Sequence, residues 1–349
     1  MFVLHRRLKV YIAQWLLKMK KLKAIGYNGS EFAAFEKQIP EVTGRDLLVE
    51  VKAVSINPID SKLKHMLGGN IDNPRILGFD GCGIVKAAGQ SAHLFKVGDE
   101  VYYAGDMTRD GSNANLQLID ERIVGHKPKS FSYTEAAAMP LCAVTAWESL
   151  FERLGIGSRD SEKTVLLIGA AGGVGSIAIQ LAKQVAKLKV VATASREESK
   201  DWCQKMGADI VLDHHNLQAQ FQQKKLTAPE YILCMGVPDD YLLEMIEVVA
   251  PQGAICLLAN VDQPFDLNLL KPKSIRLAWE MMFTRSKFET QDMGEQGKIL
   301  NQLSKLIDSN QIISIQTCRL NTIDAASVAE AHKVIEAGKM IGKLSLSRD

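Results

Sequence analysis

The stretch best suited to bind a charged ligand is the glycine-rich turn at residues 169–175, which reads GAAGGVG. The apolar run TVLLI precedes it, and apolar residues at three- and four-residue steps follow it from Val174 to Val185. This order predicts a strand, a turn and a helix whose free N–H groups attract phosphate. Glycines lack the Cβ atoms that would hold a diphosphate away. We therefore expect a dinucleotide site at Ala171, Gly172, Gly173, Val174 and Gly175.

A glycine turn in an unrelated α/β unit is the alternative, and the flanking strand and helix disfavour it. The residues after the next strand indicate which dinucleotide binds. A site for NAD usually has an acidic residue about 20 residues after the glycines, where it binds the ribose hydroxyls. Here Ala194 stands nineteen residues after Gly175 (194 − 175 = 19), with no acid at that place.

Polar and basic residues follow instead. Ser195 and Arg196 come next, and Lys200 lies one helical turn later. Such residues suit the 2′-phosphate that distinguishes NADPH, because they donate charge-assisted hydrogen bonds to it. We expect NADPH as the cofactor. The neighbouring acids Glu197 and Glu198 keep NADH open as the alternative, unless they face solvent in the first turn of a helix.

The elements that must position this site alternate along the second half of the chain. Short apolar runs predict strands at 164–168, 189–193, 210–212, 231–234 and 254–258, and a helix over 196–206 that Gly207 ends. Helical patterns return at 296–308 and 325–336, and a last strand is expected at 342–346. Strands alternating with helices predict an α/β fold with a doubly wound parallel sheet.

The first half has a different pattern. Strands are expected at 21–27 and 47–54, a turn into a short helix at 55–60, and further strands within 74–85 and 97–102. Short strands separated by Gly and Pro predict an irregular all-β barrel over about residues 20–130. The segment 134–151 reads as helical, but Pro140 should break or kink it.

Composition limits the class of protein. The chain has 349 residues, 46% of them hydrophobic and 23% charged, which is ordinary for a globular protein of two domains. Its net charge of +2 gives no sign of nucleic-acid binding. The six cysteines form no CxxC pair, which predicts reduced thiols in a cytoplasmic protein. No apolar stretch approaches the ~20 residues that span a bilayer.

The N-terminal stretch of the chain is basic and partly apolar. Its apolar run 10–17 is short, Gln14 interrupts it, and no small-residue cleavage site follows, so a secretory signal is not expected. We expect residues 1–18 to be a loosely held extension. An amphipathic basic helix lying on a membrane or a partner is the alternative.

Several ordered motifs give the chain a family resemblance. They are SINPID, PRILGFDGCGIV, FKVGDEV, AAAMPLCAVTAWESL, VLLIGAAGGVGSIAIQLAK, KMGAD and GKMIGKLSL. With them, the chain from about Met19 to its end resembles the medium-chain dehydrogenase/reductase superfamily, on its quinone oxidoreductase branch. The resemblance implies a GroES-like barrel for substrate, over 19–140 and 286–349. A Rossmann domain would be inserted at 141–285, with the cofactor in the cleft between the two domains.

Many members of this superfamily are zinc alcohol dehydrogenases, so the resemblance requires a test for metal ligands. A catalytic zinc needs three ligands from Cys, His, Asp or Glu. The family's three ligand places fall on Asn57, on Phe79 and near Leu141, with Cys142 one residue off. The stretch 103–118 has no cysteine for a structural zinc. We therefore expect no bound metal.

The resemblance also implies which residues surround the nicotinamide. Asn57 and Asp60 are the candidate catalytic residues, although Asp60 can equally serve to hold its turn. The candidate cofactor contacts in addition to the glycine turn and Ser195, Arg196 and Lys200 are Thr145, Met235, Gly236, Leu258, Ala259 and Lys343. The segment 274–288 resembles the edge that pairs subunits, which predicts a homodimer. There Trp279, Met282 and Phe283 are expected either to line a pocket or simply to pack.

Without zinc, hydride transfer suits an acceptor that already attracts electrons. We expect an NADPH-dependent oxidoreductase that reduces a quinone, an enone or a similar activated carbonyl or alkene. Two alternatives remain open at this point. One is a non-catalytic NADPH-binding protein of the crystallin type, and the other is a zinc-dependent alcohol dehydrogenase.

Overall fold

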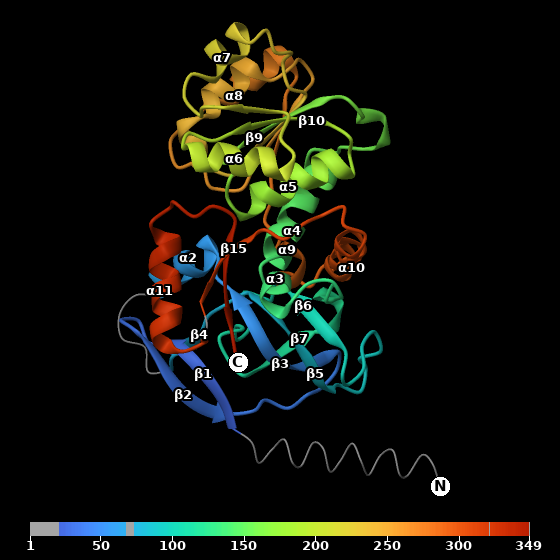
Figure 1. Cartoon of the computed structure of the whole chain (residues 1–349), viewed down its shortest axis with the longest axis vertical. Coiled ribbons are helices and arrows are strands. Elements are labelled where there is room, and N and C mark those ends of the chain that lie inside the picture. Colours follow the sequence, from blue (N-terminus) through green and yellow to red (C-terminus); the bar gives the residue numbers. More distant parts are fainter. Residues whose placement is uncertain (1–20, 68–72, 321, 349) are drawn as a thin grey trace.

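The computed structural model describes residues 21–67, 73–320 and 322–348. The expected extension at residues 1–18 lies outside this range. Figure 1 shows a parallel sheet with its helices at one end of the molecule and mostly antiparallel strands at the other, joined through α4 (Pro140–Trp147). No helix in the described ranges has the length and apolar character needed to cross a membrane.

The parallel sheet carries the glycine turn. Its six strands lie in the order β11-β10-β9-β12-β13-β14, and every neighbouring pair is parallel. The central strand β9 is buried at all five positions, because helices cover both faces of the sheet. This order and the parallel pairing confirm the expected doubly wound α/β fold. The strands are β9 (Thr164–Ile168), β10 (Lys189–Thr193), β11 (Ile210–Leu212), β12 (Tyr231–Cys234), β13 (Ala254–Leu257) and β14 (Arg276–Trp279).

Helices connect these strands. The helix α6 ends as expected at Gly207, whose φ of 111° is left-handed and suits glycine. The short helices α7 and α8 were not anticipated, because each has only seven residues and a weak apolar pattern. The connecting elements are α5 (Gly173–Gln184), α6 (Glu197–Met206), α7 (Leu217–Gln223), α8 (Leu242–Val248) and the 3₁₀ helices η3 (Ser158–Asp160), η4 (Pro238–Asp240) and η5 (Leu267–Lys273).

The other end contains two sheets within the described residues. One has seven strands, in the order β15-β16-β3-β5-β6-β8 with β7 paired to β3, and the other has three, in the order β2-β1-β4. The strands are β1 (Lys21–Tyr27), β2 (Phe32–Gln38), β3 (Asp46–Ser55), β4 (Arg75–Ile76), β5 (Asp80–Ala88), β6 (Glu100–Tyr103), β7 (Leu116–Asp120), β8 (Val124–His126), β15 (Gln316–Leu320) and β16 (Lys343–Ser347). Thus β16, from the end of the chain, pairs with β3 from its beginning.

The remaining helices pack beside or between the sheets. The break expected at Pro140 is confirmed, because α3 stops before this residue and α4 begins on it. A π-helix, η2, continues α4 without interruption. These helices are α2 (Pro58–Met66), α3 (Tyr133–Ala137), η2 (Glu148–Arg153), α9 (Thr284–Lys287), α10 (Glu295–Asp308), α11 (Ala325–Glu336) and the 3₁₀ helix η1 (Glu121–Ile123).

Candidate cofactor and substrate site

A cavity of about 570 Å³ opens at the carboxyl ends of the parallel strands and reaches α2 and the start of β16. Two residues from the candidate set, Asp60 and Lys200, do not line it. Met282 and Phe283 are part of its wall, whereas Trp279 is outside it and 50% exposed. The candidates that do line the cavity are Asn57, Thr145, Ala171, Gly172, Gly173, Val174, Gly175, Ser195, Arg196, Met235, Gly236, Leu258, Ala259 and Lys343.

The glycine turn forms one wall, and close packing explains its composition. A Cβ on Gly175 would lie 2.3 Å from the carbonyl oxygen of Ala170, and one on Gly173 would lie 2.6 Å from the Sγ of Cys142. Neither position therefore tolerates a side chain. The helix α5 begins at Gly173, so its free N–H groups are at the cavity. This geometry fits a diphosphate.

The turn is also joined to the C-terminal segment. The N–H of Gly342 donates to the carbonyl oxygen of Ala171 at 2.9 Å, and Gly172 and Gly342 form a parallel bridge. The left-handed φ of 61° at Gly342 lets the chain turn there into β16. The turn after β9 of the parallel sheet and the segment before β16 of the seven-stranded sheet thus meet at this cavity.

The polar and basic residues after β10 take different positions relative to the cavity. Ser195 and Arg196 are exposed at the cavity, and Arg196 Nη2 donates to the carbonyl oxygen of Lys339 at 2.9 Å. Lys200 instead pairs with Glu197 on the outer side of α6, with Nζ 3.3 Å from Oε2. Arg196 is therefore better placed than Lys200 to meet a phosphate in the cavity.

A buried polar network lies at the opposite end of the cavity. Lys343 Nζ donates to Asn57 Oδ1 at 2.6 Å and to the carbonyl oxygen of Ile56 at 3.0 Å, and lies 3.3 Å from Asp80 Oδ2. Asn57 Nδ2 donates to the same Asp80 oxygen at 2.8 Å, while the N–H of Leu141 donates to the other. Burial raises the pKa of Asp80, and the Lys343 ammonium opposes this shift.

Asp60 holds its turn rather than facing the cavity. Its Oδ2 accepts the N–H of Asn57 at 2.8 Å, and its Oδ1 accepts the N–H of Gly78 at 3.1 Å. Burial raises the pKa of Asp60 to about 7, with a further contribution from the Asp80 carboxylate, while the Asn57 N–H opposes the shift. These contacts favour the positioning role that the sequence left open and make direct proton transfer by Asp60 the weaker interpretation.

Sequence reasoning missed several residues at this site. Asp80 was seen only as part of an altered metal motif, yet it is the centre of the buried network. Its place in GFDGCG, between two glycines and beside the lost ligand, was the available signal. The side chains of His214, Tyr241, Glu280 and Lys339 have no sequence pattern that assigns them to the cavity, and only the tertiary structure brings them there.

The donor set does not fit a catalytic zinc at the family's place. Asn57 is engaged with an ammonium and a carboxylate, and Phe79 has no donor atom. Burial raises the pKa of the nearby Cys142 thiol to about 12, whereas zinc binds the thiolate. Within the described part of the chain, the only His, Cys, Asp and Glu group compact enough for a metal is Asp213, His214 and His215, which follows β11.

Comparison with known proteins agrees with this architecture. The model of the alcohol dehydrogenase GroES-like domain matches residues 43–146, and that of the zinc-binding dehydrogenase matches residues 173–295. A zinc-type alcohol dehydrogenase-like protein of Staphylococcus aureus is 40% identical over 337 residues, which cover 93% of this chain and 100% of the relative.

Solved structures give the same result. A protein of Rhizobium etli, described as a zinc-dependent alcohol dehydrogenase, is 41% identical with a TM-score of 0.90, covering 95% of this chain and 99% of that one. A quinone oxidoreductase of Pseudomonas syringae shares the fold at 23% identity and a TM-score of 0.79, covering 93% and 99%. The chain therefore belongs to the medium-chain dehydrogenase/reductase superfamily and is an oxidoreductase of that family.

Proposed function

We propose that the protein uses NADPH, without zinc, to reduce a quinone or a related activated carbonyl or alkene. The observation that carries this proposal is the composition of the two ends of the cavity. A glycine cradle and Arg196 lie at one end, and Asn57 and Lys343 lie at the other. The first end suits a dinucleotide with a 2′-phosphate, and the second has no donor set for a catalytic zinc.

The polar groups near the second end limit the chemistry. Thr145 Oγ1 donates its proton to the carbonyl oxygen of Leu141 at 2.7 Å. The hydroxyl can therefore accept a hydrogen bond from a bound ligand but does not donate one to it. The Lys343 ammonium already has three acceptors. Neither group provides the strong electrophilic help that an unactivated ketone requires. An acceptor that is already electron-poor fits this site better.

Bound NADPH would supply a hydride, and one proton from solvent would complete reduction of a quinone to its hydroquinone. The chain's own contribution is to hold the acceptor beside the nicotinamide and exclude water. Met282 and Phe283 are almost fully buried in the cavity wall and provide an apolar surface for a flat ring. Asn57 has a second amide hydrogen in addition to the one that Asp80 accepts, and this hydrogen is available to orient an acceptor oxygen.

The proposal includes a homodimer in the cytoplasm. The strand β14 lies at the edge of the parallel sheet, and large apolar side chains are exposed around it: Trp279 at 50%, Met281 at 43% and Phe288 at 68%. An exposed strand edge with apolar neighbours favours pairing with a second copy. All six cysteines lie among the described residues, none of them forms a disulfide, and five are buried. Reduced thiols of this kind fit a reducing compartment.

The test is turnover with a panel of acceptors. We expect NADPH oxidation with small quinones and with enones, and little or no NADP⁺ reduction with ethanol. Asn57→Ala should lower the quinone rate and leave NADPH affinity within a few fold. Asn268→Ala, at an exposed asparagine outside the cavity, is the matched control and should change neither.

Two results would contradict the proposal. Faster oxidation of alcohols than reduction of quinones would favour an alcohol dehydrogenase. Tight NADPH binding with no turnover of any acceptor would favour a cofactor-binding protein without catalysis.

A further inference from the structure

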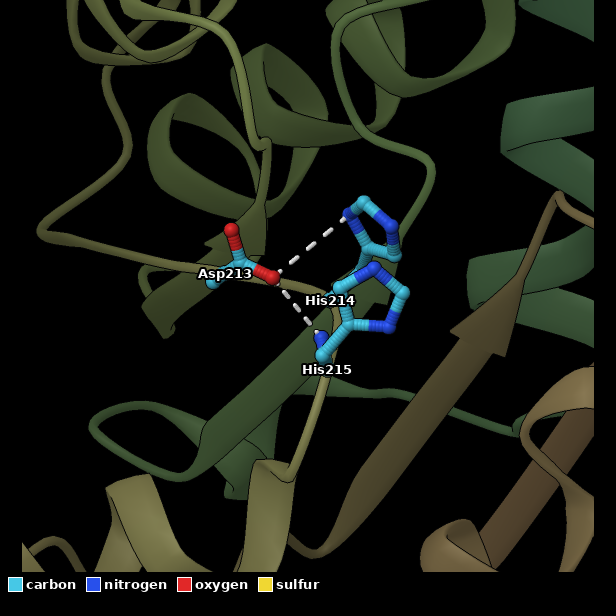
Figure 2. Close-up of side chains that lie close together, drawn as sticks. All are labelled: Asp213, His214 and His215. Atoms are coloured by element: carbon cyan, nitrogen blue, oxygen red, sulfur yellow. Dashed lines mark hydrogen bonds and ion pairs between the residues drawn. The ribbon is translucent and has the colours of Figure 1, made fainter.

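A compact group of metal-binding side chains lies outside the family's zinc position. Asp213, His214 and His215 follow β11 directly, and their ligand atoms all lie within 4.8 Å of one another. Figure 2 shows the two imidazole rings beside the Asp213 carboxylate. Their centroids are 3.9 Å apart and their planes are tilted by 48°. Asp213 Oδ1 is 3.9 Å from His214 Nδ1. The side chains of Asp213 and His214 are 43% and 28% exposed, so an ion in solution has access to them.

The backbone that carries these ligands is fixed before any ion binds. Gln220 of α7 accepts the N–H of Asp213 at 3.0 Å and donates to the carbonyl oxygens of Asp213 and His215, at 2.9 and 2.6 Å. Asp213 Oδ1 also accepts the N–H of His215 at 2.9 Å. Because the turn is preformed, mainly side-chain rotations are needed to close the ligands on an ion.

The required movement is small. Two ligand atoms about 2.0–2.1 Å from a tetrahedral zinc ion lie about 3.4 Å apart. The present spacing of up to 4.8 Å is therefore too wide by little more than an ångström. Rotation of the exposed His215 ring and the partly exposed His214 ring covers that distance.

The donor types indicate the class of metal. Two imidazoles and one carboxylate favour Zn²⁺, Cu²⁺ or Ni²⁺ over Mg²⁺ and Ca²⁺, which prefer oxygen ligands. Three protein ligands leave at least one coordination position for water or an anion.

We propose that Asp213, His214 and His215 form an exchangeable binding site for a divalent transition metal at the rim of the cofactor cavity. The site is separate from the family's catalytic position at Asn57 and Phe79. It adjoins the other end of the cavity, because β11 pairs with β10 and the N–H of Ala194 donates to the carbonyl oxygen of Leu212. His214 lines the cavity, whereas His215 is exposed and lies outside the lining.

One consequence concerns zinc content. Zinc retained at this site would appear in elemental analysis of the protein without serving hydride transfer. A zinc stoichiometry near one would then not by itself indicate an alcohol dehydrogenase. Assigning zinc to a site requires variants.

The experiment is a calorimetric titration of the full chain, free of any affinity tag and stripped with a chelator, with Zn²⁺. Cobalt(II) absorption in a parallel titration reports the ligand types. The starting protein carries Cys318→Ser, because Cys318 is the partly exposed thiol in the described chain and can bind zinc itself. We expect one equivalent of Zn²⁺ to bind, and Mg²⁺ to give no signal.

Two conservative variants test the ligands. His215→Gln removes an imidazole at an exposed position, and Asp213→Asn keeps an acceptor for the His215 N–H while removing the charge. Each should weaken Zn²⁺ binding by at least about tenfold. His93→Gln, at an exposed histidine outside the cluster, should bind as the starting protein does.

The proposal fails if no Zn²⁺ binds at concentrations up to about 1 mM, which corresponds to about −4 kcal/mol. It also fails if both cluster variants bind Zn²⁺ as tightly as His93→Gln does. A cobalt spectrum with intense sulfur-to-metal charge transfer would assign the metal to a thiolate and would equally contradict it.

Discussion

The Nζ atom of Lys343 lies 2.6 Å from the Oδ1 atom of Asn57, although 286 residues separate them along the chain. The first residue of β16 is thereby fastened to the loop before α2, beside the buried carboxylate of Asp80. Lys343 is 3% exposed, and its charge is balanced within the protein rather than by water. The network therefore joins the beginning and the end of the chain at the part of the cavity where we propose that the substrate binds.

Lys343→Met should destabilise the protein because it leaves Asp80 buried without its cation. Breaking a buried pair in this way costs about 3–5 kcal/mol of unfolding free energy. The double variant Lys343→Met with Asp80→Asn should recover much of this loss, since no uncompensated charge remains. Urea unfolding of the three proteins measures the effect, and Lys271→Met, at an exposed lysine, is the control. Equal stability of the single and double variants would show that the charge is not the cause.

Arg196→Ala should weaken NADPH binding by about tenfold or more, because charge-assisted hydrogen bonds to the 2′-phosphate are worth about 1.5–3 kcal/mol. NADH binding should change little, since NADH has no such phosphate. Fluorescence titration with both cofactors measures the difference. Lys200→Ala, one helical turn away and paired with Glu197, is the matched control. Equal weakening of both cofactors would assign Arg196 a structural role through its bond to Lys339.

Removal of metal should not affect quinone reduction. The proposed reaction uses no zinc, because Asn57 and Phe79 stand at the family's ligand positions. Protein treated with a strong chelator and then dialysed should contain far less than one zinc per chain and keep its full rate. Loss of activity on chelation, restored by added Zn²⁺, would overturn the assignment of a zinc-free active site.

His332 should contribute a loss of stability as the pH drops from about 6.5 to about 4. Burial lowers the pKa of His332 to about 4, and the nearby charge of Lys64 adds to this shift. The ring is fully buried, with Nδ1 3.0 Å from Ser61 Oγ. Between the two pKa values the unfolded chain binds the extra proton, so lowering the pH favours unfolding, by at most about 3 kcal/mol.

Comparison of variants isolates this contribution. Between about pH 6.5 and 4 the unfolding free energy of His332→Gln should rise relative to that of the wild-type protein as the pH drops, whereas the difference between His93→Gln and wild type should stay constant. The comparison is needed because burial raises the pKa of Asp60 and of Glu148, and each of these carboxyl groups contributes a slope of opposite sign over this range. An unchanged slope in His332→Gln would show that other groups govern acid unfolding.

The parallel sheet could be predicted because its signals are local. The strand at 164–168 is apolar throughout, since both of its faces are covered, and the strand at 189–193 was predicted with its observed bounds. The end of α6 at Gly207 could be predicted as well. A helix often ends at a residue in the left-handed conformation, and glycine adopts that conformation most readily. Strands β2 and β15 were not predicted. Their positions are only exposed or half-buried, so their apolar and polar residues do not alternate clearly along the sequence.

The sequence by itself determined that a glycine-rich turn follows a buried strand, that Arg196 follows the next strand, and that Asn57 and Phe79 stand at the family's ligand positions, because each depends on residue type at a short spacing. Tertiary structure alone decided that Asp80 and Lys343 complete the network with Asn57, that Asp60 faces its own turn, and that Trp279 lies outside the cavity. Such relationships depend on which distant segments pack together. Burial and hydrogen-bond partners then set the charge and direction of each side chain, and no local pattern records them.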